Sequence, residues 1–206
     1  MKNALYVMRE YFAGVLALTG TVLVASLLWM LLSLLILPLP AATAALFFTL
    51  GRAADDLAGN PFNDFLTGLR TYWRRATIIG LPALVLGVAL GVDALYFLGQ
   101  SSTALRGVGW LFSSFFLLWM TIMLMLWPVL VLRNIAGRHL LGESFWLAMA
   151  TLPWRLVTLI VAVLVTVVAF AYPLFIPVAP GVIALVSSCL ALRTFRRYGL
   201  VCDKWV

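Results

Sequence analysis

Asp93 is the only acidic side chain in the long apolar segment 77–99, and it is the first candidate for chemistry. If the segment spans a membrane, a carboxylate inside it commonly marks a proton or ion pathway. At ~1.5 Å per residue, however, Asp93 lies about 24 Å along a helix counted from Thr77. This distance predicts a position near the outer membrane interface, where a charge costs less. A coupling role and an interfacial acid with no such role both fit the pattern.

The other reactive side chains form no recognisable catalytic or metal-binding pattern. His139 follows Arg138 in a polar stretch, and no Cys, Asp or Glu surrounds it at metal-ligand spacing. Glu143 has no second carboxylate nearby for paired acid–base work. Cys189 and Cys202 show no metal spacing, and we expect no disulfide between them. Phosphate-binding glycine loops and nucleophile elbows do not occur either. We therefore expect no enzyme activity, no metal and no cofactor.

The elements that must position these residues are apolar helices. The chain is 65% hydrophobic and 10% charged, whereas a soluble domain has about 45–50% apolar and ~25% charged residues. The apolar runs are unbroken and do not alternate with polar residues as β-barrel strands do. We therefore predict an all-α fold, a polytopic transmembrane helical bundle that forms a single membrane domain over residues 1–206.

Six apolar segments are expected to cross the bilayer, although a spanning helix needs about 20 residues and two of them are shorter. They are residues 13–37, 41–50, 77–99, 107–132, 156–172 and 181–192, the second and the sixth being the short ones. The first is longer than the ~7–15-residue core of a signal peptide, and the helix-breaking Pro38 and Pro40 follow it. Alternatively, segment 41–50 is re-entrant, which gives five spans and an N-terminus outside.

Residues 60–75 predict a helix on the membrane surface that continues into the span 77–99 without a break. Asn60 and Pro61 are typical of a helix start, as N-cap and first helical residue. One apolar face is expected to consist of Phe62, Phe65, Leu66, Leu69, Tyr72 and Trp73, with Arg70, Arg74 and Arg75 elsewhere. We expect a second surface helix over residues 144–155, so the bundle carries two amphipathic cytoplasmic surface helices.

The basic residues set the predicted orientation. If the N-terminus and segments 52–75, 133–155 and 193–206 are cytoplasmic, every Lys and Arg except Arg106 is inside. We therefore expect a multi-pass protein of the bacterial inner (cell) membrane with cytoplasmic N- and C-termini. The net charge of +7 comes from basic residues at the ends of apolar segments. We therefore expect contact with the lipid bilayer and none with nucleic acid.

A weak parallel internal repeat appears at an offset of 81 residues, with halves of about 26–99 and 107–180. Its matched pairs include Arg52 with Arg133, Trp73 with Trp154, and Arg74 with Arg155. Repeats of this kind occur in transporters, with sites at the repeat interface. Duplication of a stable helical hairpin without any transport role explains the pattern equally simply, and we favour it.

Ala83, Gly87 and Gly91 form a stripe of small residues at four-residue spacing in the span 77–99. Small side chains let helix backbones approach closely. The stripe indicates either a dimer or partner interface or, as we favour, packing inside the bundle. Pro82 is expected to kink the same helix.

The segments LPLPAATAALFFTLGR (37–52) and FNDFLTGLRTYWRRA (62–76) resemble the YesL-like family of bacterial membrane proteins, whose domain has no assigned function. The matching residues are Pro40, Thr43, Ala45, Leu46, Arg52, Phe62 and Phe65. The chain has Leu39-Pro40 where the family has Ile-Gly-Pro, so the resemblance does not fix the backbone shape of this turn. The resemblance covers most of the chain and supplies no catalytic residues. It implies an accessory component of carbohydrate uptake by ABC-type importers.

Two functional hypotheses follow. The first is a non-enzymatic partner protein, associated with the subunits of a sugar importer or with a second copy of itself. The stretches 65–75 and 146–155 would then dock a partner or sense lipid, with Arg52, Trp73, Arg74, Trp154 and Arg155 as interaction or structural residues. The alternative is a small-solute transporter or channel built on the repeat, which predicts a polar cavity near the bilayer midplane.

Overall fold

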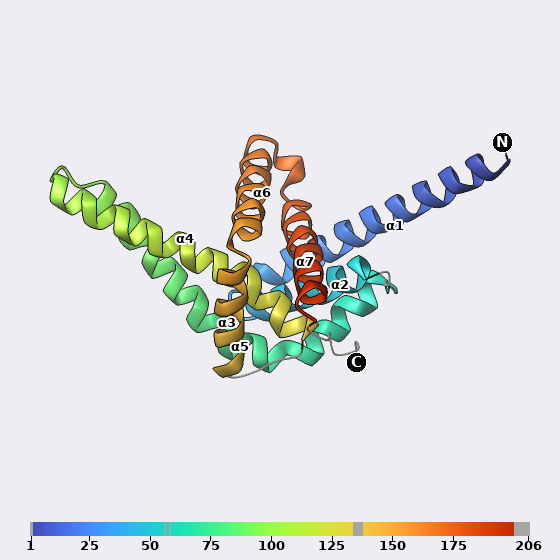
Figure 1. Cartoon of the computed structure of the whole chain (residues 1–206), viewed down its shortest axis with the longest axis horizontal. Coiled ribbons are helices and arrows are strands. Elements are labelled where there is room, and N and C mark those ends of the chain that lie inside the picture. The colour runs from blue at the N-terminus through green and yellow to red at the C-terminus, as the bar shows by residue number, and fades with distance from the viewer. Residues whose placement is uncertain (1, 56, 58, 134–137, 200–206) are drawn as a thin grey trace.

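The computed structural model describes residues 2–55, 57, 59–133 and 138–199, and these residues are helical apart from short connections. Within them lie seven α-helices and one 3-10 turn (Figure 1): α1 (Lys2–Ser33), α2 (Leu39–Ala54), α3 (Pro61–Leu98), α4 (Thr103–Leu132), α5 (Arg138–Ala150), α6 (Leu152–Ala171), η1 (Pro173–Phe175) and α7 (Ala179–Arg197). The predicted all-α fold is confirmed.

Four of these helices, α3, α4, α6 and α7, are long and apolar enough to cross a membrane. Two shorter apolar helices, residues 17–33 and α2, complete the set. The apolar helices therefore lie where the six segments were predicted, and the chain is a multi-pass membrane protein. The sixth segment was expected to be short, but α7 has 19 residues because its helix continues through the arginines at its end.

Helix α2 lies at the centre of the bundle and packs against α1, α3, α4 and α7. Nearly all of its residues from Pro40 to Gly51 are buried. Four of them are alanines, at positions 41, 42, 44 and 45, which lets the surrounding helices approach closely. The predicted segment 41–50 is therefore a helix enclosed by protein.

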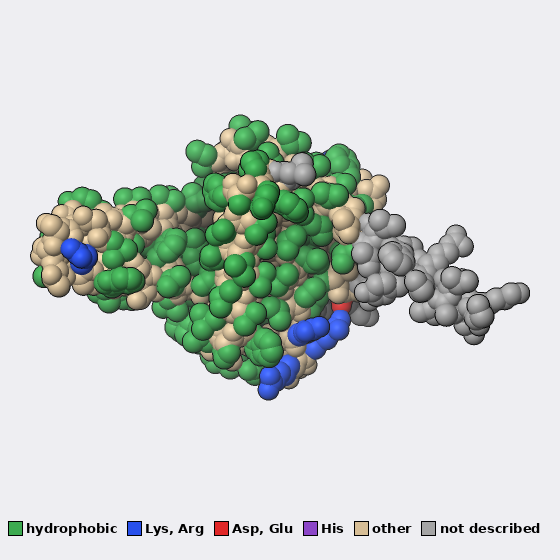
Figure 2. Space-filling view, turned by 90° about the horizontal axis from the view of Figure 1, so that it is seen from above, with side chains coloured by type: hydrophobic (Ala, Val, Ile, Leu, Met, Phe, Trp, Pro, Cys, Tyr) green, Lys and Arg blue, Asp and Glu red, His purple; other side chains and the backbone are tan. Residues whose placement is uncertain are grey.

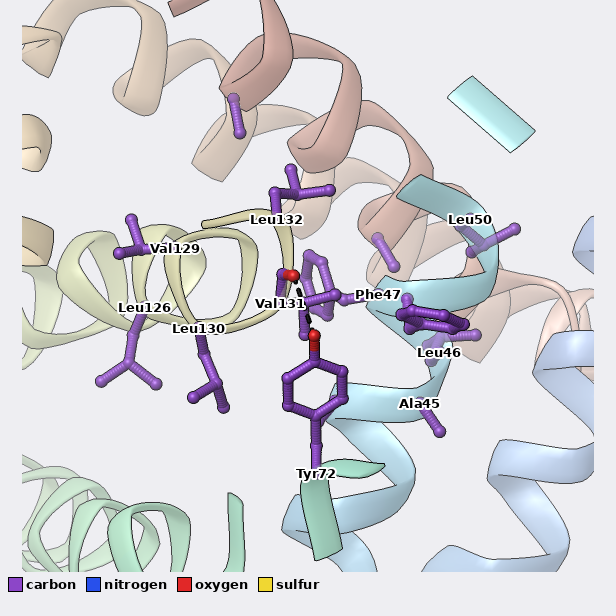
Figure 3. Close-up of a cluster of buried hydrophobic side chains, with 14 of the residues drawn as sticks. Ala45, Leu46, Phe47, Leu50, Tyr72, Leu126, Val129, Leu130, Val131 and Leu132 are labelled. Carbon is purple, nitrogen blue, oxygen red and sulfur yellow. Dashed lines mark hydrogen bonds between the residues drawn. The ribbon is translucent and has the colours of Figure 1, made fainter. Parts of the chain in front are cut away.

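Tyr72 fastens α3 to the end of α4 inside this core (Figure 3). Its hydroxyl donates a hydrogen bond of 3.1 Å to the carbonyl oxygen of Val131. Helix α4 ends at Leu132, so this carbonyl has no partner within its own helix. Phe47 and Leu46 of α2 lie beside the pair, and Tyr72 thus links the first half of α3 to both neighbouring helices.

The surface helix and the span of residues 60–99 form one helix, as predicted, but its inward face differs from the predicted one. The buried residues are Asp64, Phe65, Gly68, Tyr72, Ala76, Gly80, Ala83 and Ala94, whereas Phe62 and Trp73 are exposed. The inward face differs because α3 packs closely against α2 through its glycines. A Cβ at Gly68 would lie 2.9 Å from the Cβ of Phe48, and one at Gly80 would overlap Pro40.

The stripe of small residues in α3 serves packing within the bundle. A Cβ at Gly87 would lie 3.1 Å from the indole nitrogen of Trp119, and one at Gly91 would lie 3.4 Å from Phe116. Both aromatic residues belong to α4, which runs beside the second half of α3 in one arm of the molecule (Figure 1). Phe97 and Phe112 stack at 5.6 Å further along this arm. These contacts agree with the favoured interpretation, packing inside the bundle, although Ala83, Gly87 and Gly91 also line a cavity of about 440 Å³.

The second surface helix differs from its prediction. Helix α5 ends at Ala150 and α6 begins at Leu152, so Trp154 and Arg155 belong to the first turns of α6. Pro153 explains the break, because a proline without an N–H group is tolerated in the first turn of a helix but not in its interior. The corresponding stretch of α3 is unbroken, and the internal repeat stays a prediction.

Candidate functional site

Three ion pairs tie helix ends together where the basic residues gather. Arg52 in the last turn of α2 lies 3.3 Å from Asp64 in the first turn of α3. Arg133, directly after α4, pairs with Glu143 of α5. Arg196 of α7 lies 2.6 Å from Asp55, the residue that caps α2. An arginine at the end of a helix also interacts favourably with the helix dipole, so these contacts fix the relative positions of five helices.

The repeat-related pair Arg52 and Arg133 plays the same structural role twice. Each stands at the end of one helix and binds a carboxylate of the next helix along the chain. The sequence pattern matched the two arginines but missed Asp64 and Glu143 as their partners. The sequence did contain a sign of this pairing. In both cases the acid lies in an early turn of the helix that follows the arginine.

The two residues of the second repeat-related pair, Arg74 and Arg155, have different environments. Arg74 is exposed on α3, whereas Arg155 is 1% exposed on α6. None of the three guanidinium nitrogens of Arg155 has a hydrogen-bond partner among the described residues. Burying a charge without a partner costs several kcal/mol, roughly, because the charge loses its hydration. Arg155 is therefore the most unusual polar group in the described structure.

A cavity of about 390 Å³ lies between the start of α6 and the end of α7. Its walls are Ala150, Thr151, Pro153, Trp154, Leu190, Arg193, Thr194, Arg197 and Tyr198. The backbone N–H of Arg155 donates to the carbonyl oxygen of Thr151, 3.1 Å away, so the buried arginine follows this wall by one helical turn. The aromatic ring of Trp146 on α5 meets Tyr198 edge-on at 5.8 Å between centroids.

The visible surface is largely apolar apart from two basic areas (Figure 2). One group of Lys and Arg side chains lies at the edge of the molecule beside an acidic side chain, and a smaller patch lies at the tip of the α3–α4 arm. Arg106 belongs to this tip and donates hydrogen bonds to the carbonyl oxygens of Gln100 and Ser101. Charge is thus concentrated at the ends of apolar helices.

The predicted site residues lie in several separate places. Pro40, Thr43 and Phe65 belong to the core around α2, where the Trp29 indole donates to the Thr43 hydroxyl at 3.0 Å and Phe65 is 1% exposed. These three residues pack in the core, and a role in interaction stays a prediction for them. Cys202 lies outside the described residues, and Cys189 is a free, half-buried thiol of α7.

The interaction residues lie apart from this core. Trp73 and Arg74 are exposed on α3, and Trp154 lines the cavity beside α7. Asp93 lies in the last turns of α3, which ends at Leu98, near the tip of the arm. The structure thus places Asp93 far along the helix from the basic end, and its coupling role stays a prediction.

Sequence reasoning missed the side of the cavity that α7 provides. Arg193 and Arg197 were treated only as markers of the cytoplasmic side. Their spacing of four residues, with Thr194 and Tyr198 each one position later, already places all four on neighbouring faces of one helix.

Comparison with known proteins adds one finding. Residues 22–94 match the model of a family described as a protein of unknown function, DUF624, of which the YesL-like family is a part. The match covers the end of α1, all of α2 and most of α3, and it confirms the resemblance over these helices. No curated protein and no solved structure matches the chain.

Proposed function

We propose that this chain, which carries the DUF624 match over its central helices, is a non-enzymatic protein of the bacterial inner membrane that acts by binding another membrane protein. Both termini are cytoplasmic in this proposal, as the positive-inside pattern predicts. The partner that the family resemblance implies is a subunit of an ABC-type carbohydrate importer.

The observation that carries the proposal is the two-sided first half of α3. One side is held rigidly, since Tyr72 bonds to α4 and Phe65 is enclosed by the core. The other side presents Phe62 and Trp73, 48% and 40% exposed, together with exposed Arg74. Aromatic residues and arginine are enriched at protein interfaces, and a rigid helix presents them without a large cost of ordering.

Helix α5 presents a second exposed surface, and this one is apolar. Leu141, Phe145 and Trp146 are each about half exposed on it, while Leu140, Ser144 and Leu147 are buried. The buried side is therefore used for packing within the bundle, and the exposed aromatic side is free to contact lipid headgroups or a partner.

Lipid contact alone is the competing explanation of both surfaces, because amphipathic helices with tryptophan and arginine also lie in the headgroup region. The alternative of a solute transporter has less support. The cavity beside the stripe of small residues, about 440 Å³, is lined almost entirely by apolar and aromatic side chains, among them Val88, Phe116 and Met120. No observation on the described residues favours a polar path, so we do not propose transport.

Copurification from native bacterial membranes after chemical crosslinking tests the proposal. We expect the wild-type chain to retain an importer subunit, and the double variant Trp73→Ala/Arg74→Glu to lose it. Arg106→Gln, at the other end of the molecule, is the matched control and should retain the partner. Membrane insertion of each variant is measured by extraction with carbonate.

Two results would count against partner binding. One is that the wild-type chain is always recovered alone. The other is that the double variant leaves the membrane although no specific partner has been lost. The second result would assign Trp73 and Arg74 to anchoring in lipid.

A further inference from the structure

We propose that the cavity between α6 and α7 binds a phosphate group, carried either by an anionic phospholipid or by a free phosphorylated molecule. This inference does not depend on the proposed partner. It starts from the size and lining of the cavity, because about 390 Å³ holds a phosphate with part of the group that carries it.

One side of the cavity is lined by basic residues of α7, and the other side is formed by the first residues of α6. Leu190, Arg193, Thr194 and Arg197 follow each other at positions i, i+3, i+4 and i+7 of α7 and share one face. Opposite them lie Thr151, Pro153 and Trp154 at the beginning of α6. Two guanidinium groups can donate forked hydrogen bonds to phosphate oxygens.

The charges of the cavity are not balanced by the acids that the structure describes. No acidic side chain is part of its lining. Asp55, Asp64 and Glu143 are engaged with Arg196, Arg52 and Arg133, respectively. Among the described residues, therefore, Arg193 and Arg197 have no carboxylate within ion-pair distance.

Buried Arg155 is the second, independent observation. It is 1% exposed, and its guanidinium has no hydrogen-bond partner among the described residues. It does not itself line the cavity but follows Thr151 of the cavity wall by one turn of α6. A buried positive charge acts over a longer range than an exposed one, because little water screens it. An anion in the adjacent cavity would reduce the cost of burying Arg155, and Arg155 would in turn strengthen its binding.

The start of α6 also favours the binding of an anion. This helix has 20 residues, and the positive end of its dipole faces the cavity at Thr151 and Pro153. The hydroxyls of Thr151 and Thr194 already donate to Leu147 and Leu190 within their own helices. The donors left for a phosphate are therefore the arginines, the Tyr198 hydroxyl, the Trp154 indole N–H and backbone N–H groups.

A purely structural role explains only part of the arrangement. Arginines in the last turns of a helix stabilise its dipole, which accounts for Arg193 and Arg197 at the end of α7. It does not account for Arg155, which lies near the start of α6, where a positive charge is unfavourable. The basic lining and the buried arginine together point to a bound anion.

Trp154 and Tyr198, 56% and 43% exposed, stand at the cavity beside the arginines. Aromatic residues of this kind mark the headgroup level of a membrane, and basic pockets between helices at this level bind phospholipid headgroups. A headgroup phosphate could thus reach the cavity from the bilayer, and a free phosphorylated molecule could reach it from water.

Binding to the full-length chain tests the site. Delipidated protein is titrated with phosphatidylglycerol and with phosphatidylcholine in detergent, and bound lipid is counted by native mass spectrometry. Inorganic phosphate is titrated separately by calorimetry. The variant is Arg193→Gln/Arg197→Gln, both exposed positions, with Arg106→Gln as the matched control.

Preference for phosphatidylglycerol over phosphatidylcholine that falls about tenfold or more in the double variant supports a headgroup site. No lipid preference, but phosphate binding by the wild type that the double variant loses, supports a free phosphorylated ligand. Binding of neither probe overturns the proposal. It is equally overturned if the double variant binds as the wild type does, or if the control loses binding to the same degree.

Discussion

The hydrogen bond between Tyr72 and the carbonyl oxygen of Val131 gives a quantitative prediction, which the variant Tyr72→Phe tests. The change keeps the ring and removes only the hydroxyl, whose bond of 3.1 Å joins α3 to the last turn of α4. Tyr72 is 4% exposed, so water cannot easily replace the lost donor. The Val131 carbonyl is then buried without a partner.

The expected cost can be worked from two known ranges. A buried carbonyl left without a donor costs about 1–3 kcal/mol, whereas hydrogen bonds between transmembrane helices average ~0.6 kcal/mol in measured cases. Because the Val131 carbonyl has no partner within α4, we expect a value at the lower end of the first range, about 1–1.5 kcal/mol. For a chain of this size this corresponds to a decrease in Tm of about 2–6 °C.

Thermal unfolding of the purified full-length protein in a mild detergent measures the effect, followed by the intrinsic tryptophan fluorescence. Tyr96→Phe is the matched control, since Tyr96 is 63% exposed on the same helix and the same hydroxyl is removed there. We expect its Tm to equal that of the wild type. If Tyr72→Phe and Tyr96→Phe behave alike, the assigned role of the buried hydroxyl is refuted.

Three further predictions concern packing, the buried charge and orientation. Gly80→Ala should destabilise the protein by about 1–3 kcal/mol, because the added methyl overlaps Pro40; Gly142→Ala, which meets nothing within 4 Å, should not destabilise it, and equal Tm values for both variants would contradict the close packing of α2 on α3. Arg155→Met should raise the unfolding free energy in phosphate-free buffer by about 1 kcal/mol or more and weaken phosphate binding; a large loss of stability instead would show that Arg155 has an internal partner. In a cysteine-free background, Arg106→Cys should react with a membrane-impermeant thiol reagent on intact cells and Arg70→Cys only after lysis; labelling of the second variant from outside would reverse the proposed orientation.

Much of the local structure was predictable from the sequence, because its signals are local. The length of each apolar run indicates a membrane helix whatever its neighbours are. Asn60 and Pro61 predicted the start of α3, and the Asn60 side chain does accept the backbone N–H of Phe62 at 3.1 Å. The family resemblance rested on residues of α2 and α3 and is confirmed there.

The sequence did not reveal which side of each helix faces inward. In a bilayer the lipid is as apolar as the protein interior, so hydrophobicity does not distinguish the two sides. Phe62 and Trp73 were therefore assigned to the same face as Phe65, although only Phe65 is buried. Gly68 and Gly80 permit the close packing of this helix, because a Cβ at either position would collide with a side chain of α2.

The sequence by itself determined the helical class, the approximate ends of the membrane helices and the concentration of charge at these ends, since each depends on residues close together in the chain. Only the tertiary structure decided that α2 is enclosed, that Arg196 reaches Asp55 across 141 positions of the chain, and that Arg155 is buried while its counterpart Arg74 is exposed. These contacts depend on which helices meet, and that is set by the shapes of small and large side chains on several helices at once.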